Sequence, residues 1–190
     1  MISLITYLIL PLLLSGIIHH FLVIKYDLLK FLRIPVDFGL TLFGKRLFGN
    51  SKTFRGFAVM IVLTGFFMFL LSYIFTSIQL KAEPFIAGSF LGLGYSLGEL
   101  PTSFLKRRLS MPAGKQEKGV KGVFFYSLEQ IDSVIGALII AQFLVPLNIT
   151  ANSLLFITGV AFHLALDLVL YFRGYKTNLD KPFYLKQETS

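Results

Sequence analysis

The sequence of 190 residues contains no cysteine and no tryptophan, and only 15% of its residues are charged. The absence of cysteine excludes disulfides, thiolate metal sites and a cysteine nucleophile. With 55% hydrophobic residues and a mean hydropathy of +0.73, the chain has too little polar cover for a water-soluble globular protein. The apolar residues occur in long blocks between short charged stretches, and this arrangement is typical of membrane proteins.

Five apolar stretches approach the length of about 20 residues that a helix needs to cross a bilayer. They are residues 2–24, 57–78, 85–105, 131–147 and 154–172. The first stretch lacks a basic start and a small-residue cleavage site, so we expect a retained span and not a removable signal peptide. The sequence therefore predicts an all-α, polytopic integral membrane protein with about five transmembrane helices and a single domain over residues 1–190.

The charges between these stretches alternate strongly. Residues 25–56 carry seven basic and two acidic side chains, and residues 106–129 carry six basic and two acidic ones. The other two connections are almost free of charge, and basic connections are retained in the cytoplasm. We therefore expect two long cytoplasmic loops, an N-terminus outside the cell membrane, and an active site and C-terminus inside. Topology thus explains the net charge of +8, and nucleic acid is not an expected partner.

Three acidic residues lie near the expected cytoplasmic ends of the spans: Glu99, Asp132 and Asp167. An ionisable side chain in a membrane segment is costly and usually faces a partner or a watery cavity. Helical spacing places Glu129 on the same face as Asp132, and His163 on the same face as Asp167. Several carboxylates could thus converge beneath the inner leaflet.

These acids allow two interpretations. Carboxylates without cysteine suit Mg²⁺, and the neighbouring basic residues 106–108 suit phosphate, so together they indicate phosphoryl or nucleotidyl transfer at a membrane surface. Alternatively, the acids pair with lysine or arginine, and the basic residues satisfy topology and contact anionic lipid.

Residues 49–56, with the sequence Gly-Asn-Ser-Lys-Thr-Phe-Arg-Gly, offer hydroxyls, two basic side chains and a flexible backbone. Such a set suits a triphosphate, although it is not a Walker A loop, and a turn that enters a helix is the alternative. Gly88 and Gly92, four residues apart, predict close helix packing.

Several short motifs, in this order, carry a resemblance to a known family. They are Pro35-Val36-Asp37-Phe38-Gly39, Gly44-Lys45-Arg46-Leu47-Phe48-Gly49, Ser51-Lys52-Thr53-Phe54-Arg55-Gly56, Gly98-Glu99, Ser103-Phe104-Leu105-Lys106-Arg107-Arg108 and Glu129-Gln130-Ile131-Asp132. The chain resembles the CDP-archaeol synthase family, membrane relatives of the CDP-diacylglycerol synthases, over nearly its whole length. The family usually has aspartate where this chain has Glu99 and Glu129, so the charge is kept and the reach grows by one methylene.

The resemblance implies an Mg²⁺-dependent cytidylyltransferase that moves CMP from CTP to a membrane lipid phosphate. Mg²⁺ would be held by Glu99, Asp132 and Glu129. The CTP phosphates would be held by Lys52, Thr53, Arg55 and Gly56. Lys106 and Arg107, with Ser103, would act at the lipid phosphate or the leaving pyrophosphate. His163 and Asp167 are additional candidates for the site.

The expected partners are CTP, a membrane lipid phosphate of the CDP-archaeol type and the bilayer itself, and a homo-oligomer is left open. One alternative keeps the chemistry but uses phosphatidic acid or another lipid phosphate as acceptor. Another is a non-catalytic or transporting membrane protein of the same fold. The small number of spans and the lack of a visible inverted repeat weaken the transporter interpretation.

Overall fold

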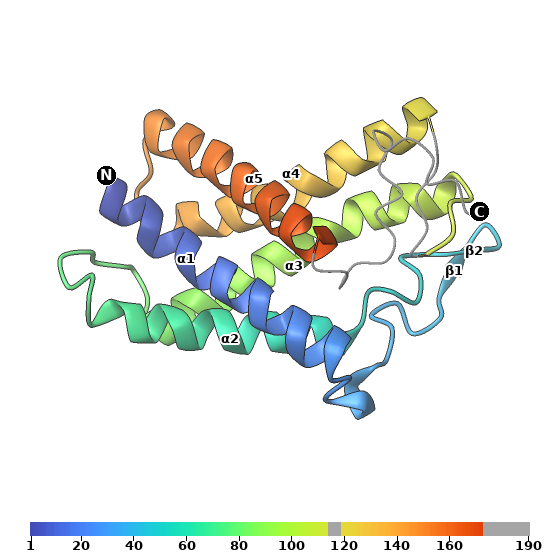
Figure 1. The fold of residues 1–190 in the computed structure, drawn as a ribbon, viewed down its shortest axis with the longest axis horizontal. Coiled ribbons are helices and arrows are strands. Elements are labelled where there is room, and N and C mark those ends of the chain that lie inside the picture. Colours follow the sequence, from blue (N-terminus) through green and yellow to red (C-terminus); the bar gives the residue numbers. More distant parts are fainter. Residues whose placement is uncertain (114–118, 173–190) are drawn as a thin grey trace.

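The computed structural model describes residues 1–113 and 119–172, and within them the chain forms five long helices (Figure 1). These are α1 (Ile2–His19), α2 (Phe54–Ser72), α3 (Pro84–Arg108), α4 (Gly119–Leu144) and α5 (Ile149–Phe172). A π-helix, His20–Lys25, continues α1, and a 3₁₀ turn, Lys30–Leu32, follows it. The strands β1 (Thr41–Leu42) and β2 (Lys45–Arg46) form a small antiparallel hairpin before α2. The prediction of an all-α protein is confirmed.

Four segments are long and apolar enough to cross a membrane: Ile2–Val23, Phe54–Ser72, Gly119–Leu144 and Ile149–Val169. The remaining helix, α3, has 25 residues and is therefore roughly 37 Å long, which also suffices to span the hydrocarbon core. It is less apolar than the others because it carries Glu99 and ends in three basic residues. The polytopic membrane architecture is confirmed, with α3 packed between α2 and α4.

The helices do not end where the apolar stretches end. The expected loop at residues 106–129 is helical at both of its ends, since α3 continues to Arg108 and α4 already begins at Gly119. Helices can continue past the hydrocarbon with charged side chains, and Lys106 of α3 pairs with Glu129 of α4 in this extension. The second of the two expected long loops is therefore much shorter than predicted. The charges counted at residues 114–118 lie outside the described residues, and so does the tail after residue 172, which is expected inside.

Local signals in the sequence explain where helices begin. Thr53 caps α2, with its hydroxyl oxygen accepting from the Gly56 amide at 3.4 Å. Pro84 occupies the first turn of α3, where its missing N–H costs nothing. The Asn148 side chain accepts from the Ala151 amide at 2.8 Å and caps α5.

Glycines bring α3 into close contact with both of its neighbours. A Cβ on Gly88 would lie 2.5 Å from the Thr64 carbonyl of α2, and one on Gly92 would lie 2.6 Å from the Met60 carbonyl. The prediction of close packing at these two glycines is therefore confirmed. On the other side, a Cβ on Gly136 of α4 would lie 2.2 Å from the Gly94 carbonyl of α3. The helix that carries Glu99 is thus held tightly on both sides.

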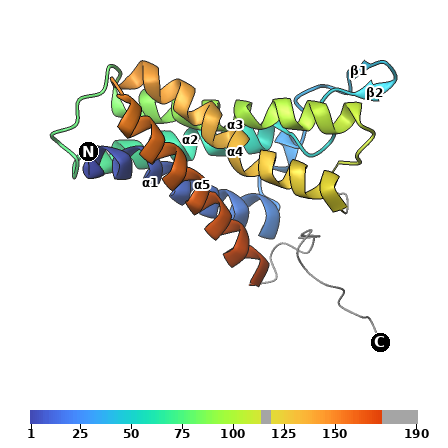
Figure 2. The same ribbon diagram turned by 90° about the horizontal axis from the view of Figure 1, so that it is seen from above.

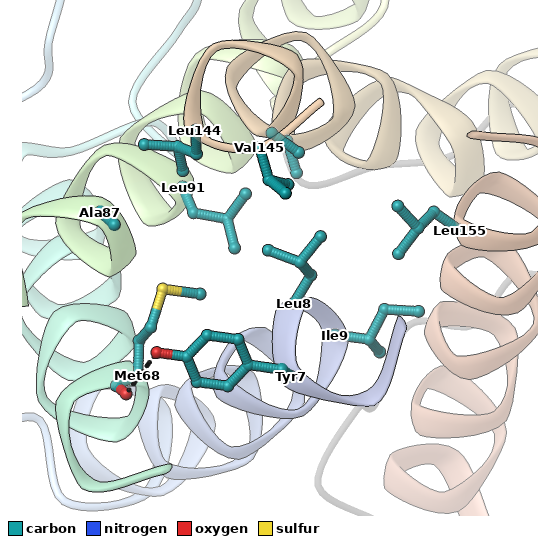
Figure 3. Close-up of a cluster of buried hydrophobic side chains, with 11 residues drawn as sticks. Tyr7, Leu8, Ile9, Met68, Ala87, Leu91, Leu144, Val145 and Leu155 are labelled. Carbon is teal, nitrogen blue, oxygen red and sulfur yellow. Dashed lines mark hydrogen bonds between the residues drawn. The ribbon is translucent and has the colours of Figure 1, made fainter. Parts of the chain in front are cut away.

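The apolar core lies at one end of the bundle, and Figure 3 shows its side chains at close range. It joins the start of α1 with the end of α2, the start of α3, the end of α4 and the start of α5, and its most buried members include Tyr7, Met68 and Leu91. The Tyr7 hydroxyl points to the Met68 carbonyl at 3.4 Å. Towards the opposite end, α5 diverges from α4 (Figure 2). The charged side chains of the helices gather at this second end.

Candidate active site

Hydrogen bonds within residues 34–54, here called the loop clasp, position the segment that precedes α2. Residues 34–36 pair with residues 52–54 through hydrogen bonds of 2.9 Å from the Val36 amide to the Lys52 carbonyl and from the Phe54 amide to the Ile34 carbonyl. Next to this pair, the buried Asp37 carboxylate accepts from the backbone amides of Gly39, Phe48 and Gly49, each at 3.0 Å. The loop between the two segments is thereby closed at its base.

Arg46 completes this clasp. Its guanidinium pairs with both oxygens of Asp37, and its Nε lies 3.3 Å from Oδ2. Burial alone would raise the pKa of Asp37, but the Arg46 pair and the three amides hold it well below its ordinary value. The carboxylate therefore stays ionised, and the loop stays closed, over the whole physiological pH range.

Lys52 leaves this loop and forms an ion pair with Glu99 of α3. Burial opposes the charge of the lysine, yet the adjacent carboxylate, with Asp132 and Glu129 farther away, raises the pKa of Lys52 above its usual value. A fixed ammonium group just before α2 therefore lies against a carboxylate in the second half of α3. The sequence predicted both residues for the site, but assigned them to different ligands.

A serine of α4 joins Glu99 to Asp132. The Ser133 hydroxyl lies 3.1 Å from Asp132 Oδ1 and 3.4 Å from Glu99 Oε1, and its side chain is fully buried. The Ser133 amide also donates to Asp132 at 2.6 Å. The two carboxylates are therefore neighbours, as the sequence predicted, and a buried hydroxyl lies between them.

Glu129 does not join this pair. It accepts from Lys106 Nζ at 2.6 Å, in an ion pair that links α4 to α3. Within residues 1–113 and 119–172, no three histidine, aspartate or glutamate side chains come close enough to form a metal site together. The expected set of three carboxylates is thus reduced to Glu99 and Asp132 in this structure.

The two candidates from α5 lie close to α4. Asp167 is buried and accepts from the Gln130 side-chain amide at 3.3 Å. The His163 ring lies 3.2 Å from the Gln130 carbonyl through Nδ1 and 3.4 Å from the Tyr95 hydroxyl through Nε2. Both residues therefore face the interior of the bundle on the side of the site.

A polar cavity of about 620 Å³ gathers many of these groups, and its size falls within the roughly 300–1,000 Å³ of ligand pockets. The cavity is bordered by α1, the loop before α2, α2, α3 and α5. Its lining includes seven predicted site residues: Lys52, Thr53, Arg55, Gly56, Glu99, His163 and Asp167.

Five predicted residues lie outside this lining: Ser103, Lys106, Arg107, Glu129 and Asp132. Asp132 lies behind Glu99 and borders a separate apolar groove between α3 and α4. Arg107 packs against Gly49, and its buried Nε has no hydrogen-bond partner among the described residues. Arg107 therefore lies beside the loop that carries Lys52, although it does not face the cavity.

The cavity also contains residues that the sequence did not single out. His19 is the last residue of α1, His20 is the first residue of the π-helix, Arg33 comes from the loop and Tyr95 from α3. His19 Nε2 is buried without a hydrogen-bond partner among the described residues. The sequence did contain a signal for His19 and His20, because two successive polar residues near the end of an apolar span indicate a polar environment there.

A second, apolar cavity of about 70 Å³ lies between α1, α3, α4 and α5. It shares four lining residues with the polar cavity: Gly16, Tyr95, His163 and Leu166. Its remaining lining is apolar and includes Leu12, Leu91 and Leu138. Polar and apolar spaces therefore meet within the membrane bundle.

Comparison with known proteins identifies the family. A family model described as CarS-like, CDP-archaeol synthase, matches residues 7–179. A CDP-archaeol synthase from Saccharolobus islandicus (strain L.S.2.15 / Lassen #1) is 36% identical over 131 residues, which are 68% of this chain and 70% of that protein. A CDP-archaeol synthase from Methanoculleus marisnigri is 34% identical over 110 residues, 56% of this chain and 61% of that protein.

The fold also has a counterpart among solved structures. It is described as "an intramembrane enzyme for archaeal membrane lipids biosynthesis", and it matches with a TM-score of 0.57 at 23% identity. The match covers 88% of this chain and 92% of that one. The helical fold and the charged site define a polytopic membrane protein. The chain belongs to the CDP-archaeol synthase family, a family of enzymes, as the motif resemblance implied.

Proposed function

We propose that this protein transfers CMP from CTP to the phosphate of a membrane lipid and so forms a CDP-activated lipid of the CDP-archaeol type. An oxygen of the lipid phosphate attacks the α-phosphorus of CTP, the bond from that phosphorus to the bridging oxygen breaks, and pyrophosphate leaves. A phosphate monoester is already largely ionised near neutral pH, so the attacking oxygen needs no general base. The main obstacle is repulsion between two anionic substrates.

The observation that carries this proposal is Lys52, held charged by Glu99 at the wall of the polar cavity. CTP phosphates offer this ammonium group a second anionic partner, and neutralising transferring phosphates is how enzymes of this kind lower the barrier. Thr53 and Gly56, at the first turn of α2, place a hydroxyl and a helix N-terminus beside Lys52, and such termini favour anions.

Glu99 and Asp132 are the proposed ligands of Mg²⁺. Two carboxylates with a hydroxyl between them match the donors that Mg²⁺ takes from proteins alongside substrate phosphates and water. When bound, the ion would neutralise charge on the phosphates. Glu129 keeps Lys106 in place between α3 and α4, and Arg107 lies next to the phosphate-binding loop.

The meeting of the two cavities supports a lipid as acceptor. The proposed reaction joins a water-soluble nucleotide to a phosphate that carries apolar chains. The polar cavity suits the phosphates, and the apolar cavity that borders Tyr95 and His163 suits the beginning of a lipid chain. We place this end of the bundle at the cytoplasmic face, with the N-terminus outside, because the basic residues of the loop before α2 favour that orientation.

The test is incorporation of α-labelled CTP into lipid by the full chain reconstituted in vesicles. The acceptors are an isoprenoid diether glycerol phosphate, phosphatidic acid and a polyprenyl phosphate, each with and without Mg²⁺. We expect labelled CDP-lipid with the diether phosphate, and we expect chelation of the metal to abolish it.

A preference for phosphatidic acid would support the proposed CMP transfer but would show that the acceptor is an ester lipid phosphate. No labelled lipid from any acceptor, from protein that remains monodisperse and folded, would refute the enzymatic proposal and favour the non-catalytic alternative.

A further inference from the structure

Residues 26–34 expose an unusual amount of apolar surface. They follow the π-helix that continues α1 and end where residues 34–36 pair with residues 52–54. The exposed fraction is 73% for Phe31, 47% for Leu28 and 46% for Ile34. In Figure 1 this segment is the blue turn that follows α1 and projects from the side of the bundle. Apolar surface of this kind costs roughly 25 cal/mol per Å² when water covers it.

Two contacts fix the segment to the start of α2. Arg55 Nη1 lies 2.5 Å from Asp27 Oδ1 and 3.2 Å from the Leu28 carbonyl oxygen. Arg55 itself is only 7% exposed and belongs to the first turn of α2, a helix long and apolar enough to cross a membrane. The segment also follows directly from the first span, which ends at Val23. Both attachments place residues 26–34 where two membrane helices leave the hydrocarbon.

The charges of the segment are mainly positive on its exposed side. Lys30 Nζ lies 3.4 Å from Asp27, but its side chain is 75% exposed, and Arg33 is exposed as well. Asp27 is engaged by Arg55, and this hydrogen bond is the main reason that its pKa is lowered. Exposed aromatic and aliphatic side chains between basic ones are typical of segments that lie in the headgroup layer of a bilayer.

We propose that residues 26–34 lie in the headgroup layer of an anionic lipid leaflet, with Phe31 and Leu28 towards the acyl chains and Lys30 towards lipid phosphates. Arg33 belongs to this segment and also lines the polar cavity. The headgroup layer would therefore be continuous with the cavity mouth. This inference concerns the membrane contact itself and does not depend on the proposed reaction.

The chain has eight tyrosines but no tryptophan, so Phe31→Trp provides a single tryptophan whose emission can be excited selectively in the full-length protein. The variant is reconstituted in vesicles of phosphatidylcholine and phosphatidylglycerol with bromine on the acyl chains of one lipid at a time. Bromine quenches tryptophan only on contact, and iodide in the buffer quenches only from water. We expect brominated lipid to remove most of the emission and iodide to have little effect.

Phe66→Trp is the matched control, because Phe66 is 46% exposed in the middle of the span α2 and must face lipid. Free N-acetyltryptophanamide gives the reference for full exposure to water. Emission of Phe31→Trp that iodide quenches as strongly as this reference, and that brominated lipid leaves unchanged, would overturn the proposal.

The charge of the leaflet is tested in the same vesicles. Bromine on phosphatidylglycerol should quench Phe31→Trp more than the same fraction of bromine on phosphatidylcholine, and adding Lys30→Gln should reduce this difference. Equal quenching by the two lipids would overturn the preference for an anionic surface. None of these readings involves CTP, so they remain valid if the proposed function fails.

Discussion

Lys52 shows how one side chain can belong both to the fold and to the proposed chemistry. It is tied to Glu99, which keeps it charged, and it faces the polar cavity where CTP phosphates are proposed to bind. Replacing it by methionine keeps the length and removes the charge. We expect Lys52→Met to lower kcat/KM for CTP by roughly 100- to 1,000-fold, the size of effect seen when one stabilising donor is lost.

The matched control is Lys81→Met, an exposed lysine of the connection between α2 and α3. Its activity should equal that of the unmodified protein. Lys52→Met with full activity would remove this lysine from the proposed site.

Asp37 closes the loop before α2 through hydrogen bonds to residues that do not line the polar cavity. In Asp37→Asn the loop loses a charged acceptor, and hydrogen bonds to charged groups contribute about 1.5–3 kcal/mol. We expect hydrogen exchange at the amides of Gly39, Phe48 and Gly49 to become roughly tenfold faster or more. Glu83→Gln, at an exposed position, serves as the control. In this variant hydrogen exchange at the same three amides should stay unchanged.

The same clasp predicts a pH dependence. A carboxylate whose pKa is lowered by folding stabilises the fold above its ordinary pKa of about 3.9, and this contribution is lost only as the pH falls through the lower value. Once intrinsic exchange rates are accounted for, protection of these amides should persist at pH 4. Loss of protection between pH 7 and pH 5 would contradict this account.

At this scale the sequence predicted several residues that the structure brings together, but not most of their partners. Lys52, Glu99 and Asp132 lie near one another, because the apolar pattern places each of them near the charged boundary of an apolar stretch. The pairing of Lys106 with Glu129 was missed, since it depends on how α3 and α4 rotate about their axes. His19 and Arg33 were missed for a different reason, because each reaches the cavity from an element with no recognisable motif.

The helices depend on close contact around α3. A methyl group on Gly136 would meet the Gly94 carbonyl at 2.2 Å and the Gly98 Cα at 2.8 Å, and both are backbone atoms that cannot move independently. Gly136→Ala should therefore force α3 and α4 apart. We expect it to destabilise the protein by about 1–3 kcal/mol, which a lowered Tm in detergent would report.

Gly16→Ala is the control for this prediction, since its new methyl group would meet only Leu166 Cδ2 at 3.5 Å, an ordinary contact. The Tm of this variant should be unchanged or slightly higher, because alanine favours a helix over glycine. Equal loss of stability in the two variants would contradict the packing described for α3 and α4.

The apolar pattern predicted the helices as elements, but not their ends. A hydropathy pattern reports the thickness of the hydrocarbon, and a helix ends where capping and backbone hydrogen bonds end. α4 therefore begins at Gly119, well before the apolar stretch at residue 131. α2 begins at Phe54 because Thr53 caps it, three residues before the predicted span.

At the scale of the whole molecule, the bundle separates an apolar core at one end from the charged site at the other. The proposed orientation places the hairpin of β1 and β2 in the cytoplasm and the connection between α2 and α3 outside. Because the chain has no cysteine, Ser77→Cys and Thr41→Cys each introduce one thiol at an exposed position. A maleimide that cannot cross membranes should label Ser77→Cys in intact cells and Thr41→Cys only after the membrane is opened. The reverse pattern would contradict the orientation.

The central claim is that Glu99 and Asp132 act together, through one divalent cation, on the phosphates of CTP. The most direct measurement is a double-mutant cycle of Mg²⁺-dependent CDP-lipid formation with Glu99→Gln, Asp132→Asn and the two combined. Side chains that act as a unit give non-additive losses. We predict that each single variant loses most of the activity. The double variant should then be as active as the less active of the two single variants. Losses that multiply, or activity in either single variant equal to that of the unmodified protein, would contradict the claim.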